Sequence, residues 1–209
     1  MRGGRLRGQT MKIPLLFDLT GQVAVVTGGN GGFGRGIAQG LAEAGTDVAI
    51  LGRNDAKNQR VLSELKSIGV PSMEVCLNLT HRAELEPTLH RSAGELGDIS
   101  ILVNNSGTVS LSGGVLQEKS EGWDHVIETQ LNAVFHLSKF AAASMLRHKR
   151  GKIINIGSMY SYFGSGLVPS YSAGRGDRRN GGVPGLASFG LRYRNHDPRR
   201  WRLCHTLTC

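Results

Sequence analysis

Short apolar runs alternate with longer segments of helical periodicity between residues 22 and 156. The apolar runs are bounded by glycine or polar residues, as expected of strands buried on both faces, and they lie at Gln22–Val26, Asp47–Leu51, Pro71–Leu77, Ile99–Val103 and Lys152–Ile156. The segments with apolar residues at helical spacing lie at Phe33–Gly45, Asp55–Ile68, Arg82–Leu96 and Ser120–Arg150.

This alternation of strand and helix predicts an α/β fold with a doubly wound parallel sheet. Strands joined by helical crossovers become parallel neighbours, and right-handed connections place helices on both faces of the sheet. Ligands of such folds bind at the carboxyl ends of the strands. Candidate chemistry is therefore expected just after each apolar run.

Composition is that of one ordinary globular domain, with 39% hydrophobic and 20% charged residues. No apolar run approaches the roughly 18 residues that span a membrane. The three cysteines (Cys76, Cys204 and Cys209) are too sparse for a disulfide framework and have no convincing zinc spacing. We therefore expect a cytoplasmic protein without a membrane partner or a metal site.

The net charge of +9 lies at the two ends of the chain. Residues 1–10 carry three arginines and no acid, residues 175–209 carry eight arginines and two acids, and residues 11–174 are neutral. We interpret 1–10 as a basic extension, 11–174 as the folded domain and 175–209 as an atypical arginine-rich tail. A neutral body does not favour a nucleic-acid partner. Salt-dependent nucleic-acid binding through the tail is the minor alternative.

A glycine-rich loop, TGGNGGFG at Thr27–Gly34, joins the first predicted strand to the first predicted helix. Glycine permits positive φ and lets the backbone approach a pyrophosphate closely. The helix N-terminus then presents free N–H groups and a positive dipole end. A tight surface turn is the bland alternative. The strand before the loop and the helix after it favour dinucleotide binding.

Four segments together resemble the short-chain dehydrogenase/reductase family. They are the TGxxxGxG spacing of the loop, NNSG at 104–107, NLT at 78–80 and GKIINIGSMYSYFGSGLVPSYSAGR at 151–175. The last segment looks like the gluconate and 2-deoxy-gluconate dehydrogenases. The resemblance implies a Rossmann sheet, NADP or NAD as cofactor, a small alcohol or ketone substrate such as a sugar acid or polyol, and homo-oligomers in the family. It implies cofactor contacts at Thr27, Gly28, Asn30, Gly32, Phe33, Gly34, Asn78, Leu79, Asn105, Gly107 and Tyr171.

The end of the second predicted strand bears on the choice between NADP and NAD. An acid at this position would bind the ribose 2′-hydroxyl, whereas an arginine accepts a 2′-phosphate. The sequence here is ILGRN, with Arg53 and no acid. Arg53 therefore favours NADP, although a solvent-exposed arginine at the start of the next helix would look the same.

The resemblance also implies a catalytic set. Hydride transfer at an alcohol needs an acid/base group at the oxygen, and a tyrosine serves when a nearby cation favours its phenolate. The family pattern Tyr-x-x-x-Lys puts both side chains on one helix face, and it matches Tyr171 with Arg175 as the cation. Ser158 matches the serine that hydrogen-bonds the substrate oxygen, and Asn132 matches the asparagine of the proton relay. Tyr160 and Tyr162 lack a cation four residues on.

Two features put turnover in question. Arg175 replaces the family's lysine, and a planar guanidinium differs from an ammonium in shape and reach, so we expect a large loss of turnover. Residues 175–209 do not contain the family's later strands and substrate loop. Because GDRRNGGV at 176–183 can be encoded so that the next frame reads AIVGMAG, we interpret the tail as a frame shift near Gly174. The alternative function is therefore a dinucleotide-binding remnant with impaired catalysis, and the assembly state stays open.

Overall fold

A computed structural model describes residues 17–160 and 165–174, and five parallel strands form one sheet in the order β3-β2-β1-β4-β5. The strands are β1 (Val23–Thr27), β2 (Asp47–Gly52), β3 (Ser72–Cys76), β4 (Ile99–Asn104) and β5 (Lys152–Asn155). Each coincides with a predicted apolar run to within one or two residues. The order changes direction at β1, whose neighbours are β2 on one side and β4 on the other. The doubly wound α/β prediction is confirmed.

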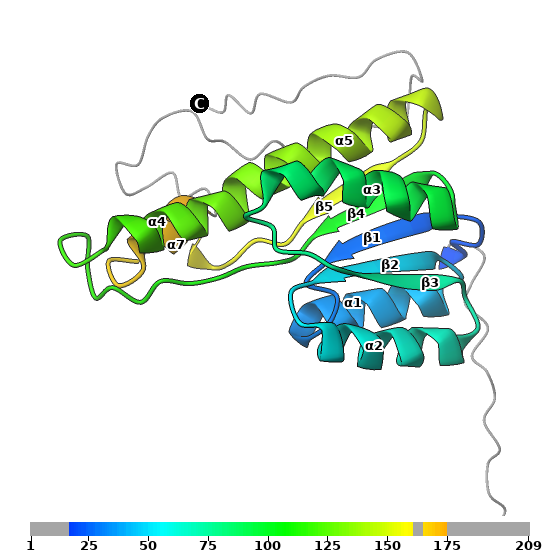
Figure 1. Cartoon of the computed structure of the whole chain (residues 1–209), viewed down its shortest axis with the longest axis horizontal. Coiled ribbons are helices and arrows are strands. Elements are labelled where there is room, and N and C mark those ends of the chain that lie inside the picture. The colour runs from blue at the N-terminus through cyan, green and yellow to red at the C-terminus, as the bar shows by residue number, and fades with distance from the viewer. Residues whose placement is uncertain (1–16, 161–164, 175–209) are drawn as a thin grey trace, which may run out of the picture.

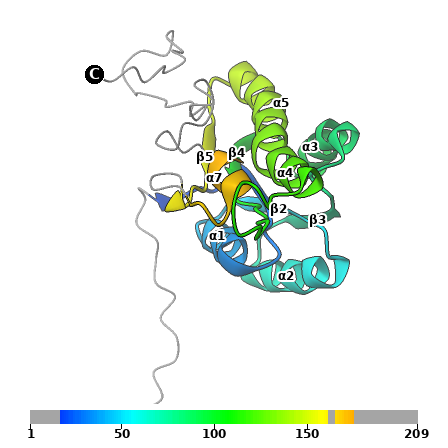
Figure 2. The same ribbon diagram turned by 90° about the vertical axis from the view of Figure 1, so that its left-hand side faces the viewer.

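Helices cover both faces of this sheet. They are α1 (Gly32–Glu43), α2 (Asp55–Ile68), α3 (Arg82–Leu96), α4 (Ser120–Ile127), the π-helical segment η2 (Glu128–Asn132), α5 (Ala133–Arg147) and α7 (Pro169–Gly174). α1 and α2 pack on one face and α3 and α5 on the other, as Figures 1 and 2 show. The short helix α7 lies beside α4, beyond the end toward which the strands point (Figure 1).

One helix prediction needs correction. The stretch predicted as a single helix over 120–150 is interrupted at Glu128–Asn132 by a π-helical turn and ends at Arg147. A π turn inserts a residue and shifts the helical phase of everything after it. Hydrophobic periodicity averages over such a local change and so cannot detect it. In α2, by contrast, Gly69 ends the helix in the left-handed conformation, as its position in the sequence predicts (φ 98°).

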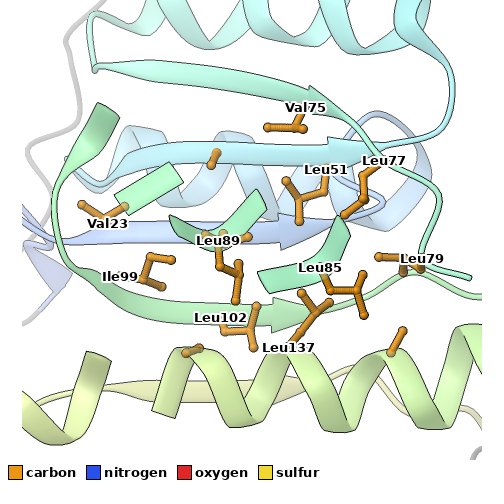
Figure 3. Packing of buried hydrophobic residues seen from close by; sticks show 14 of the residues in the cluster. Val23, Leu51, Val75, Leu77, Leu79, Leu85, Leu89, Ile99, Leu102 and Leu137 are labelled. Atoms are coloured by element: carbon orange, nitrogen blue, oxygen red, sulfur yellow. The ribbon is translucent and has the colours of Figure 1, made fainter. Parts of the chain in front are cut away.

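The core is built in two layers by alternate residues of the strands. One layer packs Leu51 and Leu102 against Leu85 of α3 and Leu137 of α5 (Figure 3). Val25 of β1 belongs to the same layer. The other packs the intervening strand residues against α1 and α2. Every residue of β1 is buried, whereas three of the four residues of β5 are exposed.

Within the described residues, no helix is long and apolar enough to cross a bilayer. The same part of the chain contains no group of three His, Cys, Asp or Glu side chains placed to hold a metal ion. The basic extension, the arginine-rich tail with Cys204 and Cys209, and the frame-shift interpretation concern residues outside the described part.

Candidate functional site

A pocket of about 320 Å³ lies at the carboxyl edge of the sheet. Its lining comes from the segments that follow β1, β2, β3 and β4, and from η2. It therefore spans the point where the strand order reverses, which is the ligand-binding position of doubly wound sheets. Among the described residues it is lined by Gly28, Asn30, Gly31, Leu51, Gly52, Arg53, Leu77, Asn78, Leu79, Asn105, Ser106, Gly107, Thr108 and Thr129.

Two glycines of the loop are required by the local geometry. Gly28 has φ of +65°, and an added Cβ would lie 3.0 Å from both Asn105 Nδ2 and Ser106 Oγ. At Gly34 an added Cβ would lie 2.2 Å from the Gly28 carbonyl oxygen. α1 can begin directly against the end of β1 only because this contact has no side chain in it. The loop thus brings bare backbone and the N-terminus of α1 to the pocket.

Thr27 joins the end of β1 to the end of β4. Its buried hydroxyl oxygen accepts hydrogen bonds from the backbone N–H groups of Asn105 and Ser106, each at 3.0 Å. In return, Asn105 Nδ2 donates to the Thr27 carbonyl oxygen at 2.9 Å. These bonds fix the two loops on either side of the switch point, so Thr27 shapes the pocket from behind its wall.

The end of β2 forms the far wall of the pocket. Gly52 is buried there, and Arg53 lines the pocket with an exposed side chain. The Gly28 N–H donates to the Leu51 carbonyl at 2.7 Å and so holds the glycine loop against β2. No acid side chain lines this pocket within the described residues. The pairing of Arg53 with an acid-free wall suits an anionic ligand.

The structure separates the expected cofactor residues into two groups. Those that line the pocket are Gly28, Asn30, Arg53, Asn78, Leu79, Asn105 and Gly107. Those outside the described lining are Thr27, Gly32, Phe33, Gly34 and Tyr171. Phe33 is 86% exposed and points its ring into solvent, so its side chain contributes nothing to the pocket wall. Seven lining residues were not predicted, and most of them stand directly beside predicted ones, which was the available signal. They are Gly31, Leu51, Gly52, Leu77, Ser106, Thr108 and Thr129.

The candidate catalytic residues after β5 and on α7 are connected by packing of aromatic rings. Tyr171 lies half-buried on α7, and its ring meets the ring of Tyr160 edge to face at a centroid distance of 5.9 Å. The Tyr160 N–H donates to Ser158 Oγ at 3.3 Å. Tyr160 thus connects the loop after β5, which contains Ser158, to α7. Arg175 lies just past the described residues.

Glu118 ties α7, the helix of the candidate acid/base Tyr171, to the loop that follows β4. It accepts hydrogen bonds from Ser170 Oγ at 3.0 Å and from Ser112 Oγ at 2.7 Å. Burial raises the pKa of Glu118, but the hydroxyl donors Ser112, Ser170 and Ser110 outweigh it and hold the pKa below its ordinary value. Ser170 is fully buried and precedes Tyr171, so this carboxylate helps to hold α7 in place.

The π-helical segment puts Asn132 and Gln130 on different faces. Asn132 Nδ2 donates to Glu128 Oε2 at 2.7 Å, and Glu128 also pairs with Arg82 at the start of α3. Gln130 is buried, donates to the Thr108 carbonyl, and its Cβ lies 3.5 Å from where a Gly174 Cβ would be. Gln130 therefore lies near Gly174, the last residue of the helix that carries Tyr171. Residues two apart on a helix point in nearly opposite directions.

Gln130 was missed by sequence reasoning. Its side-chain oxygen is buried without a hydrogen-bond partner in the described part of the chain. Buried polar side-chain atoms in proteins normally have at least one hydrogen-bond partner, from the protein or from ordered water. The only sequence signal was its place two residues before the expected Asn132, in a helix whose phase is not readable from the sequence.

Comparison with known proteins agrees with this geometry. The family model described as short chain dehydrogenase matches residues 22–176. The chain belongs to the short-chain dehydrogenase family. The matched region runs from β1 to just beyond α7, so it contains both the pocket and the tyrosine cluster.

Individual members of this family give the same result. The chain is 36% identical over 158 residues to 3-oxoacyl-(acyl-carrier-protein) reductase FabG of Escherichia coli, covering 76% of this chain and 63% of that protein. It is 37% identical over 160 residues to 2-dehydro-3-deoxy-D-gluconate 5-dehydrogenase of E. coli, covering 76% and 62%. A crystal structure assigned as an NAD(P)-dependent gluconate 5-dehydrogenase from Beutenbergia cavernae, with bound NADP at low occupancy, superposes with a TM-score of 0.71 at 32% identity, covering 76% and 63%. The chain thus spans about three fifths of these proteins.

Proposed function

We propose that the chain binds NADP, or NAD, and is built to interconvert a secondary alcohol and a ketone by hydride transfer. The observation that carries this proposal is the pocket at the β1–β4 switch point, walled by the glycine loop and by Arg53. The NADP in the B. cavernae relative supports the same choice of cofactor. Arg53, with no acid in the described pocket wall, supports NADP over NAD.

The residues present fit a dinucleotide. Gly28 and Gly34 keep the loop free of side chains, since a Cβ at either position would meet neighbouring atoms at 3.0 Å or less. The backbone around Gly31 and the start of α1 would hold the pyrophosphate, and Arg53 would face the ribose 2′-phosphate. When bound, the nicotinamide supplies the hydride acceptor or donor. The protein supplies binding, orientation and the proton.

For the chemical step, we assign proton transfer to the Tyr171 hydroxyl. The half-buried tyrosine sits on α7, which Glu118 anchors through Ser170, so its ring has a fixed position. Ser158 is proposed to hydrogen-bond the substrate oxygen, and Arg175 to favour the Tyr171 phenolate as a cation four residues on. The role of Asn132 in a proton relay stays a prediction, and Gln130 lies near Gly174 at the end of α7.

The substrate class is proposed from the relatives. Both E. coli relatives act, by name, on oxo or hydroxy compounds, one on an acyl chain held by a carrier protein and one on a sugar acid. We favour a sugar acid or small polyol, because the segment 151–175 looks like the sugar-acid branch. The second candidate is cofactor binding without turnover. The observation that favours it is Arg175 in place of lysine.

Steady-state rates decide between these candidates. The wild-type chain, Tyr171→Phe and Arg175→Lys should be assayed with NADP or NAD and a panel of sugar acids and 3-oxoacyl substrates, at equal cofactor saturation. We expect low turnover in the wild type, a gain in Arg175→Lys, and a loss of about hundredfold or more in Tyr171→Phe relative to its parent. Equal, high rates for the wild type and Arg175→Lys would refute the impairment. Unchanged turnover in Tyr171→Phe would refute the assignment of the acid/base group.

A further inference from the structure

Asn58 is a fully buried polar side chain on α2, a helix whose other buried side chains, Val61 and Leu65, are apolar. It is absent from the described pocket lining and does not belong to the catalytic cluster. A buried amide costs free energy unless its hydrogen bonds are made within the protein. Its partners therefore show why an amide stands at this place in the core.

All three strong hydrogen bonds of Asn58 go to different segments. Its Oδ1 accepts from Asn30 Nδ2 at 2.6 Å, and its Nδ2 donates to the Gly52 carbonyl and to Glu74 Oε2, each at 3.0 Å. Because a backbone carbonyl only accepts, the bond to Gly52 fixes which end of the amide is nitrogen. Asn58 thus joins the glycine loop after β1, the turn after β2 and strand β3.

Two of these partners are pocket wall. Asn30 and Gly52 both line the pocket, and Gly52 directly precedes Arg53. The packing between them leaves no space for a side chain, since a Cβ at Gly52 would lie 2.2 Å from Asn30 Nδ2. Asn58 therefore sets how closely the phosphate-binding loop approaches the turn that carries the arginine.

We infer that Asn58 is a positioning residue for the nucleotide, and that its hydrogen bond to Asn30 holds the glycine loop against the Gly52–Arg53 turn where a 2′-phosphate binds. This inference rests on the proposed cofactor function. Asn58 acts through Asn30 and Gly52 and touches no ligand itself. Loss of the link loosens the wall on the side of the 2′-phosphate, so NADPH binding suffers more than NADH binding.

The test is a calorimetric titration of NADPH and of NADH into four forms of the full chain. They are the wild type, Asn58→Leu, Asn30→Ala and the double variant. Leucine has nearly the shape of asparagine and leaves the core filled. We expect each single variant to raise the NADPH Kd about tenfold, which corresponds to one hydrogen bond. NADH should be affected about threefold at most. The double variant should bind like the singles, since both single changes break the same bond between Asn58 and Asn30.

The matched control is Gln59→Ala. Gln59 Nε2 donates to the other oxygen of Glu74, Oε1, at 3.0 Å, but Gln59 is exposed and does not reach Asn30. Its NADPH Kd should stay within about twofold of the wild type, because an exposed bond outside the pocket contributes little.

The outcomes distinguish failure of the role of Asn58 from failure of the proposed nucleotide binding. A wild type that binds neither nucleotide overturns both. A wild type that binds NADPH, with a folded Asn58→Leu of unchanged Kd or with single effects that add in the double variant, overturns the role of Asn58 alone. If Asn58→Leu fails to fold, Asn30→Ala decides, since its side chain is outside the core: unchanged NADPH affinity in that variant overturns the inference.

Discussion

β1 and β5 are both short apolar runs in the sequence, and both pair in parallel with β4, yet they end up in different surroundings. β1 is buried along its whole length between α1 and α5, with β2 and β4 on either side. In β5 only Ile153 is partly buried, and Ile154 is 44% exposed. The carboxyl end of β1 leads into the cofactor loop, and that of β5 leads into Ser158 and the tyrosine cluster.

The difference shows how the two halves of the site are held. The nucleotide half is fixed by the sheet itself, through backbone contacts and buried side chains such as Thr27 and Asn58. The proposed catalytic half is held by a ring contact between Tyr160 and Tyr171 and by the bonds of Glu118 to the serines around it. We therefore expect changes in the proposed catalytic half to affect nucleotide binding less than changes in the nucleotide half affect turnover.

The largest expected effect comes from truncating the same residue type, isoleucine, on a buried strand and on an exposed strand. Ile101 on β4 is 4% exposed, and Ile154 on β5 occupies the same face of the sheet. Ile101→Ala should lower the free energy of unfolding by about 2–5 kcal/mol, because it leaves a cavity in the core. Ile154→Ala should cost less than about 1 kcal/mol. Urea unfolding of both variants measures this, and equal losses would show β5 to be as well packed as β4.

A smaller effect is expected at the cofactor loop. Gly34→Ala places a methyl group 2.2 Å from the Gly28 carbonyl oxygen, so we expect a loss of about 1–3 kcal/mol in stability and a severe loss of NADPH binding. Gly36→Ala is the matched control, since a Cβ there meets nothing within 4 Å and the helix gains up to about 1 kcal/mol. Thermal melts and an NADPH titration test the pair. Normal binding by Gly34→Ala would disprove the close approach of α1 to β1.

The third prediction concerns Arg53, which follows β2 in the pocket wall, and its effect on the choice between NADPH and NADH. Arg53→Ser should weaken NADPH binding about tenfold and leave NADH binding within about twofold, because only the 2′-phosphate loses its cation. The ratio of the two dissociation constants is the measurement. An equal loss for both nucleotides would mean that Arg53 contacts the pyrophosphate or holds the fold instead.

The smallest effect concerns the ion pair between Arg82 of α3 and Glu128 of η2. The hydrogen bond from Arg82 holds the pKa of Glu128 below its ordinary value, and this contribution outweighs the opposing effect of burial. A lowered folded-state pKa stabilises the protein above the unfolded-state value and is lost as the pH falls through the folded-state value. Arg82 is 56% exposed, so Glu128→Gln should cost less than about 1 kcal/mol at pH 7. The difference from the wild type should vanish in acid. A difference that grows as the pH falls would contradict this account.

Much of the fold was readable from the sequence because it depends on local patterns. The strands are buried apolar runs, and α2 and α3 begin and end at the predicted residues. Asn58 was not predicted, because the expected apolar face of α2 was defined by Val61, Leu62, Leu65 and Ile68. In the structure Asn58 shares a face with Val61 and Leu65, at i, i+3 and i+7, whereas Ile68 is exposed. That spacing was the available signal.

The sequence predicted the position of candidate site residues only where they directly follow a strand. Seven of the expected loop residues line the pocket, since the carboxyl ends of parallel strands lie at one edge of the sheet. Their contacts with a cofactor stay a prediction. The sequence did not show on which face of the helix Asn132 and Gln130 each lie. That face depends on the phase of a helix that contains a π turn, and apolar periodicity does not record that turn.

The central claim is that this chain binds a nicotinamide dinucleotide at the β1–β4 switch point. The most direct measurement is hydrogen exchange of the full chain with and without saturating NADPH, read by mass spectrometry. We predict slower exchange confined to the loop at 28–34, the turn at 52–53 and the segment at 105–108, with the β5 end changing less. Absence of any protected segment, or protection that avoids the glycine loop, would contradict the account.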